Sequence, residues 1–176
     1  MSKFKRLTTK RVTLLALMIG LQVILGKLIQ IPMMEKEYNL GFVPIAVAGW
    51  LLGAPSAMIV GALGDVVGSL LFPTGTYFPG FTLTALLVGL LYGLWLHGHR
   101  ANLFHIGMAV LCTEVVNLFL NSLWLSVLYS SKNYATWLTL RAPVYLPEAI
   151  LQALVLFLVL KGLQKLKKSK VLRMLL

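Results

Sequence analysis

The sequence is poor in the residues that soluble enzymes rely on. Its 176 residues include one cysteine, five acidic residues and only 12% charged residues in all. The single cysteine, Cys112, excludes an internal disulfide and any metal site built from several thiolates. So few charges could not form the surface of a soluble domain, where roughly a quarter to a third of positions are charged. Because 59% of the residues are hydrophobic even before glycine is counted, we expect lipid to be the main solvent.

The motifs of several enzyme classes are also missing. The segment "GLQVILGK", residues 20–27, has one residue too many for a GxxxxGK[ST] phosphate-binding loop and lacks the following Ser or Thr. There is no HExxH motif, and His97, His99 and His105 are predicted to lie at the inner membrane surface, away from the acidic groups. No nucleophile with an adjacent base is apparent. We therefore expect no metal, no covalently bound cofactor and no catalysis by this chain alone; a small intramembrane enzyme is kept as an alternative.

Positive charge is concentrated at the two ends of the chain. The net charge is +11, from 16 basic and five acidic residues. Five basic residues precede the first apolar run and six close or follow the last: Lys3, Lys5, Arg6, Lys10 and Arg11, then Lys161, Lys165, Lys167, Lys168, Lys170 and Arg173. The positive-inside rule therefore predicts that both termini are cytoplasmic. Membrane topology accounts for the basicity, so we expect no nucleic-acid partner.

Both termini on one side require an even number of crossings, and each spanning helix needs about 20 mostly apolar residues. We predict an all-α membrane protein, a bundle of six transmembrane helices forming one domain over residues 1–176. The expected spans are approximately 12–30, 40–54, 55–72, 80–98, 103–128 and 143–162. Only "GAPS", residues 53–56, divides the second from the third, at a proline that can end one helix and start the next. Three segments are then expected outside: 32–39, 73–79 and 130–140.

A few polar side chains interrupt the apolar runs. Such groups normally face the bundle interior or an aqueous cavity, because hydrocarbon cannot solvate them. Asp65 shares a helix face with Gly61 and Ser69 and is expected about 10 Å below the outer end of its helix. In the fifth span, four residues spaced three, four and three apart form one stripe: Glu114, Asn117, Asn121 and Trp124. Asn121 is expected at about the same depth as Asp65.

The first and last spans add further polar groups. Glu148 and Gln152 are one turn apart in the sixth span, with Arg141 just above them, and Lys27 lies near the outer end of the first. Polar groups on four helices thus lie mainly in the outer half, which predicts a pocket open to the outside. Alternatively, Asp65 and Glu148 are interior groups paired with Lys27 or Arg141 and serve only packing.

The most distinctive stretch is "LLFPTGTYFPGFTLTALLVGLLYG", residues 70–93. Two prolines and two glycines favour a compact outer loop, while Tyr77, Phe78 and Phe81 offer flat rings for a planar ligand. Thr82 adds a hydroxyl at the start of the next helix. An aromatic belt at the bilayer interface is the alternative, although it explains the Pro-Gly framework less well.

The first span carries two small residues, Ala16 and Gly20, four positions apart on its inner half. Small residues at this spacing allow another helix to approach closely. The spacing fits contact with a partner protein and internal packing equally well.

Together these features resemble the substrate-binding S components of energy-coupling factor (ECF) vitamin transporters, and the folate-specific branch most closely. The resemblance is carried by residues 41–93 and 138–163. Its more specific pieces are the Phe-Pro-x-Gly and Tyr-Phe-Pro-Gly-Phe-Thr motifs at 72–75 and 77–82. It implies a six-helix S component in the bacterial cell membrane that captures a vitamin outside. Such a subunit docks on a transmembrane coupling subunit (the T component) with two cytoplasmic ABC ATPases, which use the ATP.

The resemblance also implies roles for individual residues. Ala16 and Gly20 match the small residues of the docking helix, and Arg141 matches an arginine suited to clamp a carboxylate. Lys27 stands where the folate branch usually has arginine, so it keeps the charge without the bidentate fork. The family further implies delivery by toppling of the S component in the membrane. We also predict that the segments 32–39 and 73–79 act as gates, with their prolines and glycines as hinges.

Our hypothesis from these residues is a folate site. A carboxylate, Asp65 or Glu148, would accept hydrogen bonds from the pterin, and Lys27 with Arg141 would receive the anionic glutamate tail. The aromatic residues would cover the rings, and two further polar residues complete the predicted set: Tyr77, Phe78 and Phe81, then Thr82 and Asn121. An S component for another vitamin, such as pantothenate, riboflavin or a queuosine precursor, is the main alternative.

Overall fold

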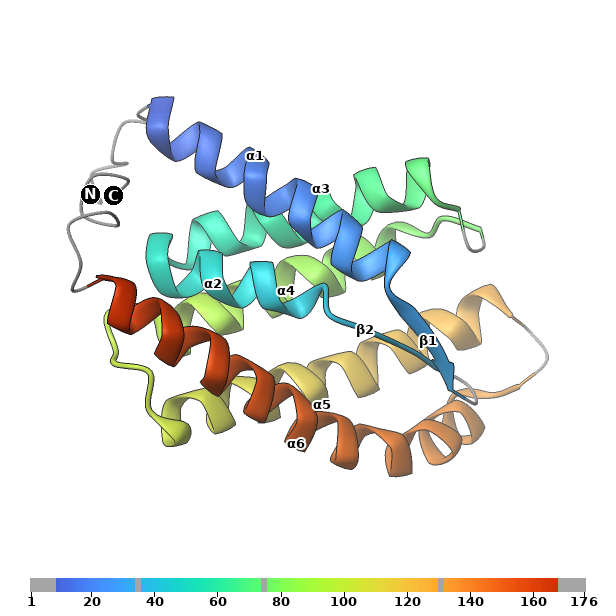
Figure 1. The fold of residues 1–176 in the computed structure, drawn as a ribbon. Coiled ribbons are helices and arrows are strands. Elements are labelled where there is room, and N and C mark those ends of the chain that lie inside the picture. Colours follow the sequence, from blue (N-terminus) through green and yellow to red (C-terminus); the bar gives the residue numbers. More distant parts are fainter. Residues whose placement is uncertain (1–8, 34–35, 74–75, 130–131, 168–176) are drawn as a thin grey trace, which may run out of the picture.

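The structure, a computed structural model, describes residues 9–33, 36–73, 76–129 and 132–167. Its elements in chain order are α1 (Thr9–Val23), the π-helix η1 (Ile24–Leu28), β1 (Gln30–Met33), β2 (Lys36–Asn39), α2 (Phe42–Leu52), α3 (Ala54–Leu71), α4 (Pro79–Leu96), α5 (Leu103–Leu128) and α6 (Tyr134–Lys167). Figure 1 shows the helices packed as a bundle, with α1 beginning and α6 ending at the same end. We call this the inner end, and the opposite end, where the β1–β2 hairpin lies, the outer end. The start of α1 and the end of α6 at one end of the bundle agree with the predicted topology, while the cytoplasmic placement of the termini stays a prediction.

Five helical stretches are long and apolar enough to cross a membrane: Thr9–Leu28, α3, α4, α5 and Tyr134–Leu166. The chain is therefore a multi-pass helical protein, as the apolar runs predict. The second predicted span, 40–54, differs, because α2 has only 11 residues. At 1.5 Å per residue it is about 16 Å long, roughly half the thickness of a bilayer core. The described residues thus contain six α-helices, of which α3, α4, α5 and α6 have spanning length, and α1 reaches it together with η1.

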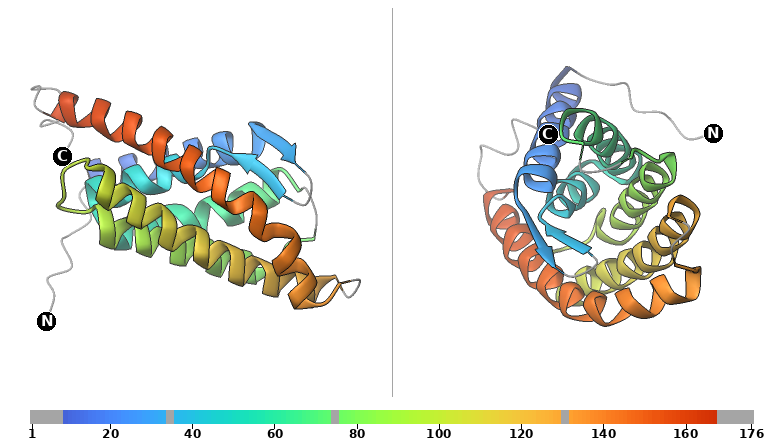
Figure 2. Two further views of the ribbon diagram at one scale, coloured as in Figure 1. Left: turned by 90° about the horizontal axis from the view of Figure 1, so that it is seen from below. Right: turned by 90° about the vertical axis from the view of Figure 1, so that its right-hand side faces the viewer.

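A β-hairpin precedes α2. β1 and β2 pair antiparallel, with Gln30 opposite Asn39 and Met33 opposite Lys36. This pairing is a correction to the all-α prediction, which treated 32–39 as an outer loop. The chain returns through β2 to contact the end of the first helix, where Leu40 N donates to the carbonyl of Leu25 at 3.1 Å. Figure 2 shows the hairpin lying across one side of the outer end, between α1 and α6.

The last helix is longer than predicted. The predicted span was 143–162, but α6 begins at Tyr134 and continues through Pro143 and Pro147 to Lys167. Most of the predicted outer segment 130–140 is therefore helical. Figure 2 shows that α6 is bent, as expected for a helix that loses backbone hydrogen bonds at proline. Its buried residues recur every three or four positions on one face: Trp137, Arg141, Tyr145, Glu148, Gln152, Leu156 and Leu160.

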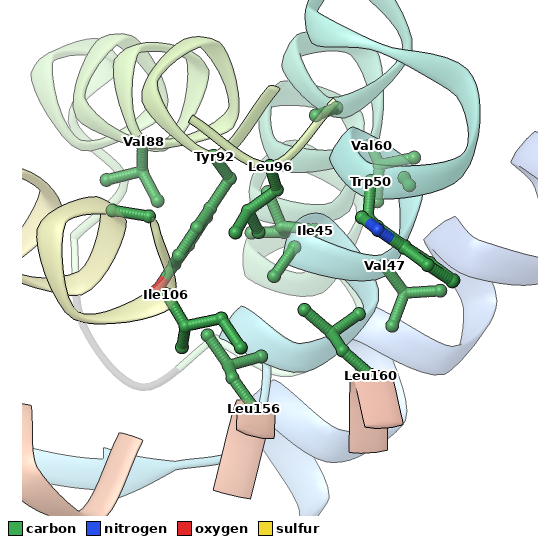
Figure 3. Packing of buried hydrophobic residues seen from close by; sticks show 14 of the residues in the cluster. Ile45, Val47, Trp50, Val60, Val88, Tyr92, Leu96, Ile106, Leu156 and Leu160 are labelled. Atoms are coloured by element: carbon green, nitrogen blue, oxygen red, sulfur yellow. The ribbon is translucent and has the colours of Figure 1, made fainter. Parts of the chain in front are cut away.

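The hydrophobic core fills the inner half of the bundle. Tyr92 and Leu96 of α4, Ile45 of α2 and Leu156 of α6 converge there, as Figure 3 shows. Tyr92 and Leu156 are almost completely buried, with 1% and 0% of their surface exposed. Such side chains pack closely against each other, so the inner half has no room for a ligand. Any cavity must therefore lie toward the outer end.

Glycines allow α3 and α4 to pack against each other at very short distance. A Cβ at Gly61 would overlap the carbonyl of Ala85, and one at Gly89 would overlap the carbonyl of Ala57. Between α2 and α3 the chain turns at Gly53, whose φ of 88° is unfavourable for a residue with a side chain. This turn is the predicted break at 53–56.

Candidate functional site

A cavity of about 680 Å³ opens in the outer half of the bundle, within the size range of small-molecule sites, roughly 300–1,000 Å³. All five spanning stretches, the start of α2 and the hairpin contribute to its wall. Eight of the nine substrate-site residues predicted from the sequence line it: Lys27, Asp65, Tyr77, Phe78, Phe81, Asn121, Arg141 and Glu148. The ninth, Thr82, lies behind this surface and is bonded to Asp65. The structure thus brings the predicted residues together, while their roles toward a ligand stay predictions.

One wall carries a chain of hydroxyl groups that ends on a carboxylate. Thr82 Oγ1 donates to Asp65 Oδ2 at 2.6 Å. Tyr77 Oη lies 3.0 Å from the same Thr82 oxygen. Since threonine has only one hydroxyl proton and it points to Asp65, the tyrosine must be the donor in the second bond. The relay runs from Tyr77 through Thr82 to Asp65 and holds the carboxylate in one orientation.

The floor of the cavity is a second polar network, between α4, α5 and α6. Gln152 Nε2 donates to Glu148 Oε1 at 3.2 Å and to Glu114 Oε1 at 2.9 Å. The hydroxyl of Tyr92 donates to Gln152 Oε1 at 3.3 Å. Glu148 and Gln152 line the cavity, whereas Glu114 lies below it. The amide of Gln152 is therefore bonded on both sides, and it fixes the carboxylate of Glu148 at the cavity surface.

The predicted polar stripe on α5 exists as a set of contacts. Asn117 Nδ2 donates to Glu114 Oε1, and Asn121 Nδ2 donates to Asn117 Oδ1, both at 3.5 Å. Trp124 Nε1 donates to Thr84 Oγ1 of α4 at 3.0 Å. The stripe leads from the buried floor toward the outer end, so it forms one polar edge of the cavity.

Buried donors without an acceptor lie on α6. Arg141 has only 6% of its surface exposed, yet its Nε and Nη1 have no hydrogen-bond partner among the described residues. The same holds for Nε1 of Trp137, which is 7% exposed. Lys132 Nζ lies 4.7 Å from the Trp137 ring centroid, adding positive charge nearby. Buried N–H groups are costly unless they are bonded, so this part of the cavity favours an anionic or acceptor-rich group.

The packing alternative for these charges predicted ion pairs of Asp65 or Glu148 with Lys27 or Arg141. Within the part of the chain that the structure describes, neither basic residue forms such a pair. Asp65 is bonded to Thr82 instead, and the stem of Lys27 lies over Gly68 of α3. The cationic groups are therefore available to a ligand.

The aromatic residues form a packed wall at the start of α4. The rings of Phe78 and Phe81 are edge to face, with centroids 6.2 Å apart, and Phe78 also lies 5.7 Å from the ring of Trp124. Gly80 makes this packing possible, because a Cβ there would meet the rings of Phe78 and Trp124. Tyr77, Phe78 and Phe81 all line the cavity, which an aromatic belt facing only lipid would not explain.

Sequence reasoning missed several residues of the lining: Gln22, Gln30, Asn39, Thr84 and Trp137. Asn39 reaches the cavity only because the hairpin folds back, and Trp137 lies in a segment predicted to be a loop. Gln22 could have been found, since an amide inside an apolar span is the same signal that identified Asp65.

At the inner half, Ala16 and Gly20 are exposed on the outside of α1. A Cβ at Gly20 would have nothing within 4 Å, so the pair serves no internal packing. An exposed small-residue surface favours contact with a partner, which stays a prediction.

The rings of His99 and His105 stack 4.2 Å apart, and no group of three metal-ligating residues occurs among the described residues.

Comparison with known proteins shows the family of this chain. Residues 10–160 match the protein family described as the ECF transporter, substrate-specific component. The chain belongs to this family. The resemblance seen in the sequence is thereby confirmed, and the chain is the substrate-specific component of a transporter.

The chain is also similar to individual members of this family. The folate transporter FolT of Clostridium novyi (strain NT) is 36% identical over 115 residues, which cover 65% of this chain and 67% of that protein. FolT of Leuconostoc mesenteroides is 30% identical over 128 residues, 72% of this chain and 69% of its own. The crystal structure of FolT bound with folic acid superimposes with a TM-score of 0.81 at 30% identity, covering 88% of this chain and 95% of that one.

Proposed function

We propose that this chain is the folate-binding S component of an ECF-type ABC importer, which captures folate outside the cell with high affinity and delivers it for uptake. One observation carries the proposal: a single cavity joins bonded carboxylates, an aromatic wall and the unpartnered donors of Arg141 and Trp137. Folate has matching parts, namely a pterin with adjacent N–H donors, a flat linker and an anionic tail. The similarity to FolT, including the form bound with folic acid, supports the same assignment.

In this mechanism the carboxylates accept the N–H groups of the pterin. Asp65 is the first candidate because the relay from Thr82 orients it, and Glu148 is the second. Each hydrogen bond to a charged group stabilises the complex by about 1.5–3 kcal/mol. Phe78 and Phe81 cover the rings, with Tyr77 nearer to solvent at 44% exposure.

The tail of folate is received by basic groups. Arg141 offers two unpartnered nitrogens, and its planar guanidinium suits a carboxylate. Lys27 contributes charge from η1 but lacks the planar fork of arginine. Asn121, on the polar edge of α5, adds amide contacts to the ligand. Because Arg141 is almost fully buried, its pairing with a carboxylate is screened little by water.

Delivery requires other subunits. The chain docks through the exposed Ala16–Gly20 surface of α1 on the T component, and two cytoplasmic ABC ATPases hydrolyse the ATP. The inner half of the bundle is closed by the core, so the ligand leaves through the outer end after the whole subunit topples in the bacterial cell membrane. The segments 32–39 and 73–79 act as gates.

Isothermal titration tests the proposal directly. The purified full chain in detergent is titrated with folic acid, and with riboflavin and pantothenate as controls. Tight one-to-one binding of folic acid without ATP is expected. Binding of riboflavin or pantothenate in its place, by protein shown to be folded, would assign the chain to another vitamin.

A further inference from the structure

Gln22 is a cavity residue whose amide oxygen has no partner. Its side chain lines the cavity from α1, two turns inward from the hairpin. The oxygen Oε1 is buried and accepts no hydrogen bond from any described residue. A buried carbonyl oxygen without a donor is unfavourable, so a donor is expected to arrive from elsewhere. Because other atoms of the Gln22 side chain line the cavity, we expect a ligand there to supply the donor.

Gly64 of α3 is what leaves room for this amide. A Cβ at position 64 would overlap both Oε1 and Cδ of Gln22. Every other residue type would therefore push the amide out of its place. The neighbouring Gly68 lies close to Lys27 in a milder way, since a Cβ there would be 3.1 Å from Cγ of that lysine and would only require a small shift of its stem. Two glycines one turn apart on α3 thus lie against two polar side chains, Gln22 of α1 and Lys27 of η1.

The depth of Gln22 indicates which part of a ligand it meets. Gln22 is five residues before Lys27, about 7.5 Å further inward along the helix. Asp65 follows Gly64 directly in the sequence and lines the same cavity, so two acceptors belong to one region of the wall. The unpartnered donors, by contrast, lie on α6 at Trp137 and Arg141.

We propose that Gln22 is a specificity-determining residue of the cavity, which accepts a hydrogen bond from an N–H or amino group of a heteroaromatic ring, and that Gly64 holds it in place. The inference rests on the proposed function, for which the ring is the pterin. It predicts that the acceptors Gln22 and Asp65 bind the N–H donors of the ring, while the basic groups of α6 bind the tail.

A double-mutant cycle tests the link between the two residues. Folic acid affinity is measured by titration for the parent, Gln22→Ala, Gly64→Ala and the double variant. Each single change is expected to weaken binding about tenfold. The double variant is expected to match Gln22→Ala alone, because the overlap disappears when the amide is removed. Losses that add in the double variant, or full affinity in Gly64→Ala, would overturn the role of Gly64.

Two controls keep the result specific. Gly107→Ala is the same change on α5, at a position where a Cβ has nothing within 4 Å, and it should leave affinity unchanged. Gln22→Met keeps the length of the side chain without the oxygen, so it reports on the acceptor even if Gly64→Ala fails to fold. Parent-like affinity in Gln22→Met would refute the proposal.

A second ligand locates the contact. Pteroic acid contains the pterin but lacks the glutamate, so Gln22→Met should lose about the same factor with both ligands. A loss confined to folic acid would place Gln22 at the tail and overturn the assignment to the ring. If the parent bound riboflavin instead, the proposed function would fail, and the cycle repeated with riboflavin, whose ring carries an N–H group, would judge Gln22 separately. Binding of pantothenate, which has no heteroaromatic ring, would overturn both.

Discussion

Thr82, in the first turn of α4, donates a hydrogen bond of 2.6 Å to the carboxylate of Asp65 in the middle of α3. The bond joins two helices whose glycines already hold them at very short distance. It places a carboxylate in the cavity wall with one oxygen bonded to the protein. An oriented carboxylate can accept the adjacent donors of a ring with little further loss of side-chain freedom.

Asp65→Asn should therefore weaken folic acid binding by about 10- to 100-fold, because it replaces a charged acceptor by a neutral amide. Thr82→Val should cause a smaller loss of several-fold, since the carboxylate stays but loses its orientation. Titration of the purified variants measures both. Thr139→Val removes an exposed hydroxyl, bonded to the carbonyl of Thr136, and serves as the control. Parent-like affinity in Asp65→Asn would leave Glu148 as the pterin acceptor.

Arg141→Met should weaken folic acid binding by about 10- to 100-fold, because it removes the buried donors of the tail site. Arg141→Lys should recover only part of this loss, since lysine lacks the planar fork. The loss should be smaller with pteroic acid, which lacks both glutamate carboxylates. Equal losses of affinity for folic acid and pteroic acid would show that Arg141 does not bind the glutamate tail.

Tyr38→Phe should release one attachment of the hairpin to α6. The hydroxyl of Tyr38 donates to the carbonyl of Val144 at 3.1 Å, across the outer end of the bundle. If the hairpin is a gate, ligand association and dissociation should both become several-fold faster, with little change in affinity. Stopped-flow tryptophan fluorescence gives both rates. Unchanged rates would mean that this bond does not limit opening.

Gly20→Leu should separate capture from delivery. The position is exposed and has open space, so folic acid binding by the isolated subunit should be unchanged. A bulky side chain should, however, prevent close approach of a partner helix and abolish both co-purification with the T component and uptake. Gly162→Leu on α6, also in open space, is the matched control and should retain both. Normal assembly of Gly20→Leu would place the docking surface elsewhere.

Gly61→Ala should destabilise the fold by about 1–3 kcal/mol, because the added methyl group overlaps a backbone carbonyl of α4 that cannot turn away. Thermal unfolding in detergent measures the effect. Gly107→Ala should instead leave stability unchanged or raise it slightly, since alanine is the better helix former. An unaffected unfolding temperature in Gly61→Ala would contradict the close α3–α4 packing.

Much of the helical framework could be predicted from the sequence. The predicted span 103–128 has the bounds of α5, and those of α3 and α4 agree closely, because apolar runs end at proline, glycine or polar turns there. Most predicted site residues also line one cavity. The reason is general: a polar side chain in a spanning helix has no favourable place in lipid and must turn inward. Asp65 and Glu148 follow this rule.

Local patterns could not predict the features that depend on contacts between distant residues. The hairpin returns the chain so that Leu40 meets Leu25, and it carries Asn39 to the cavity. The helical start of α6, with Trp137 and Arg141 on its buried face, depends on packing that outweighs two prolines.

The sequence by itself determined that the chain is a membrane protein, where most of its helices run and which polar groups turn inward, since these follow from the cost of exposing polarity to lipid. Tertiary structure alone decided which of those groups meet a partner and which face the cavity unpaired. Gln22 shows the difference: its amide is visible in the sequence, but only the packing of α1 on Gly64 buries its oxygen without a donor, on a side chain that lines the cavity.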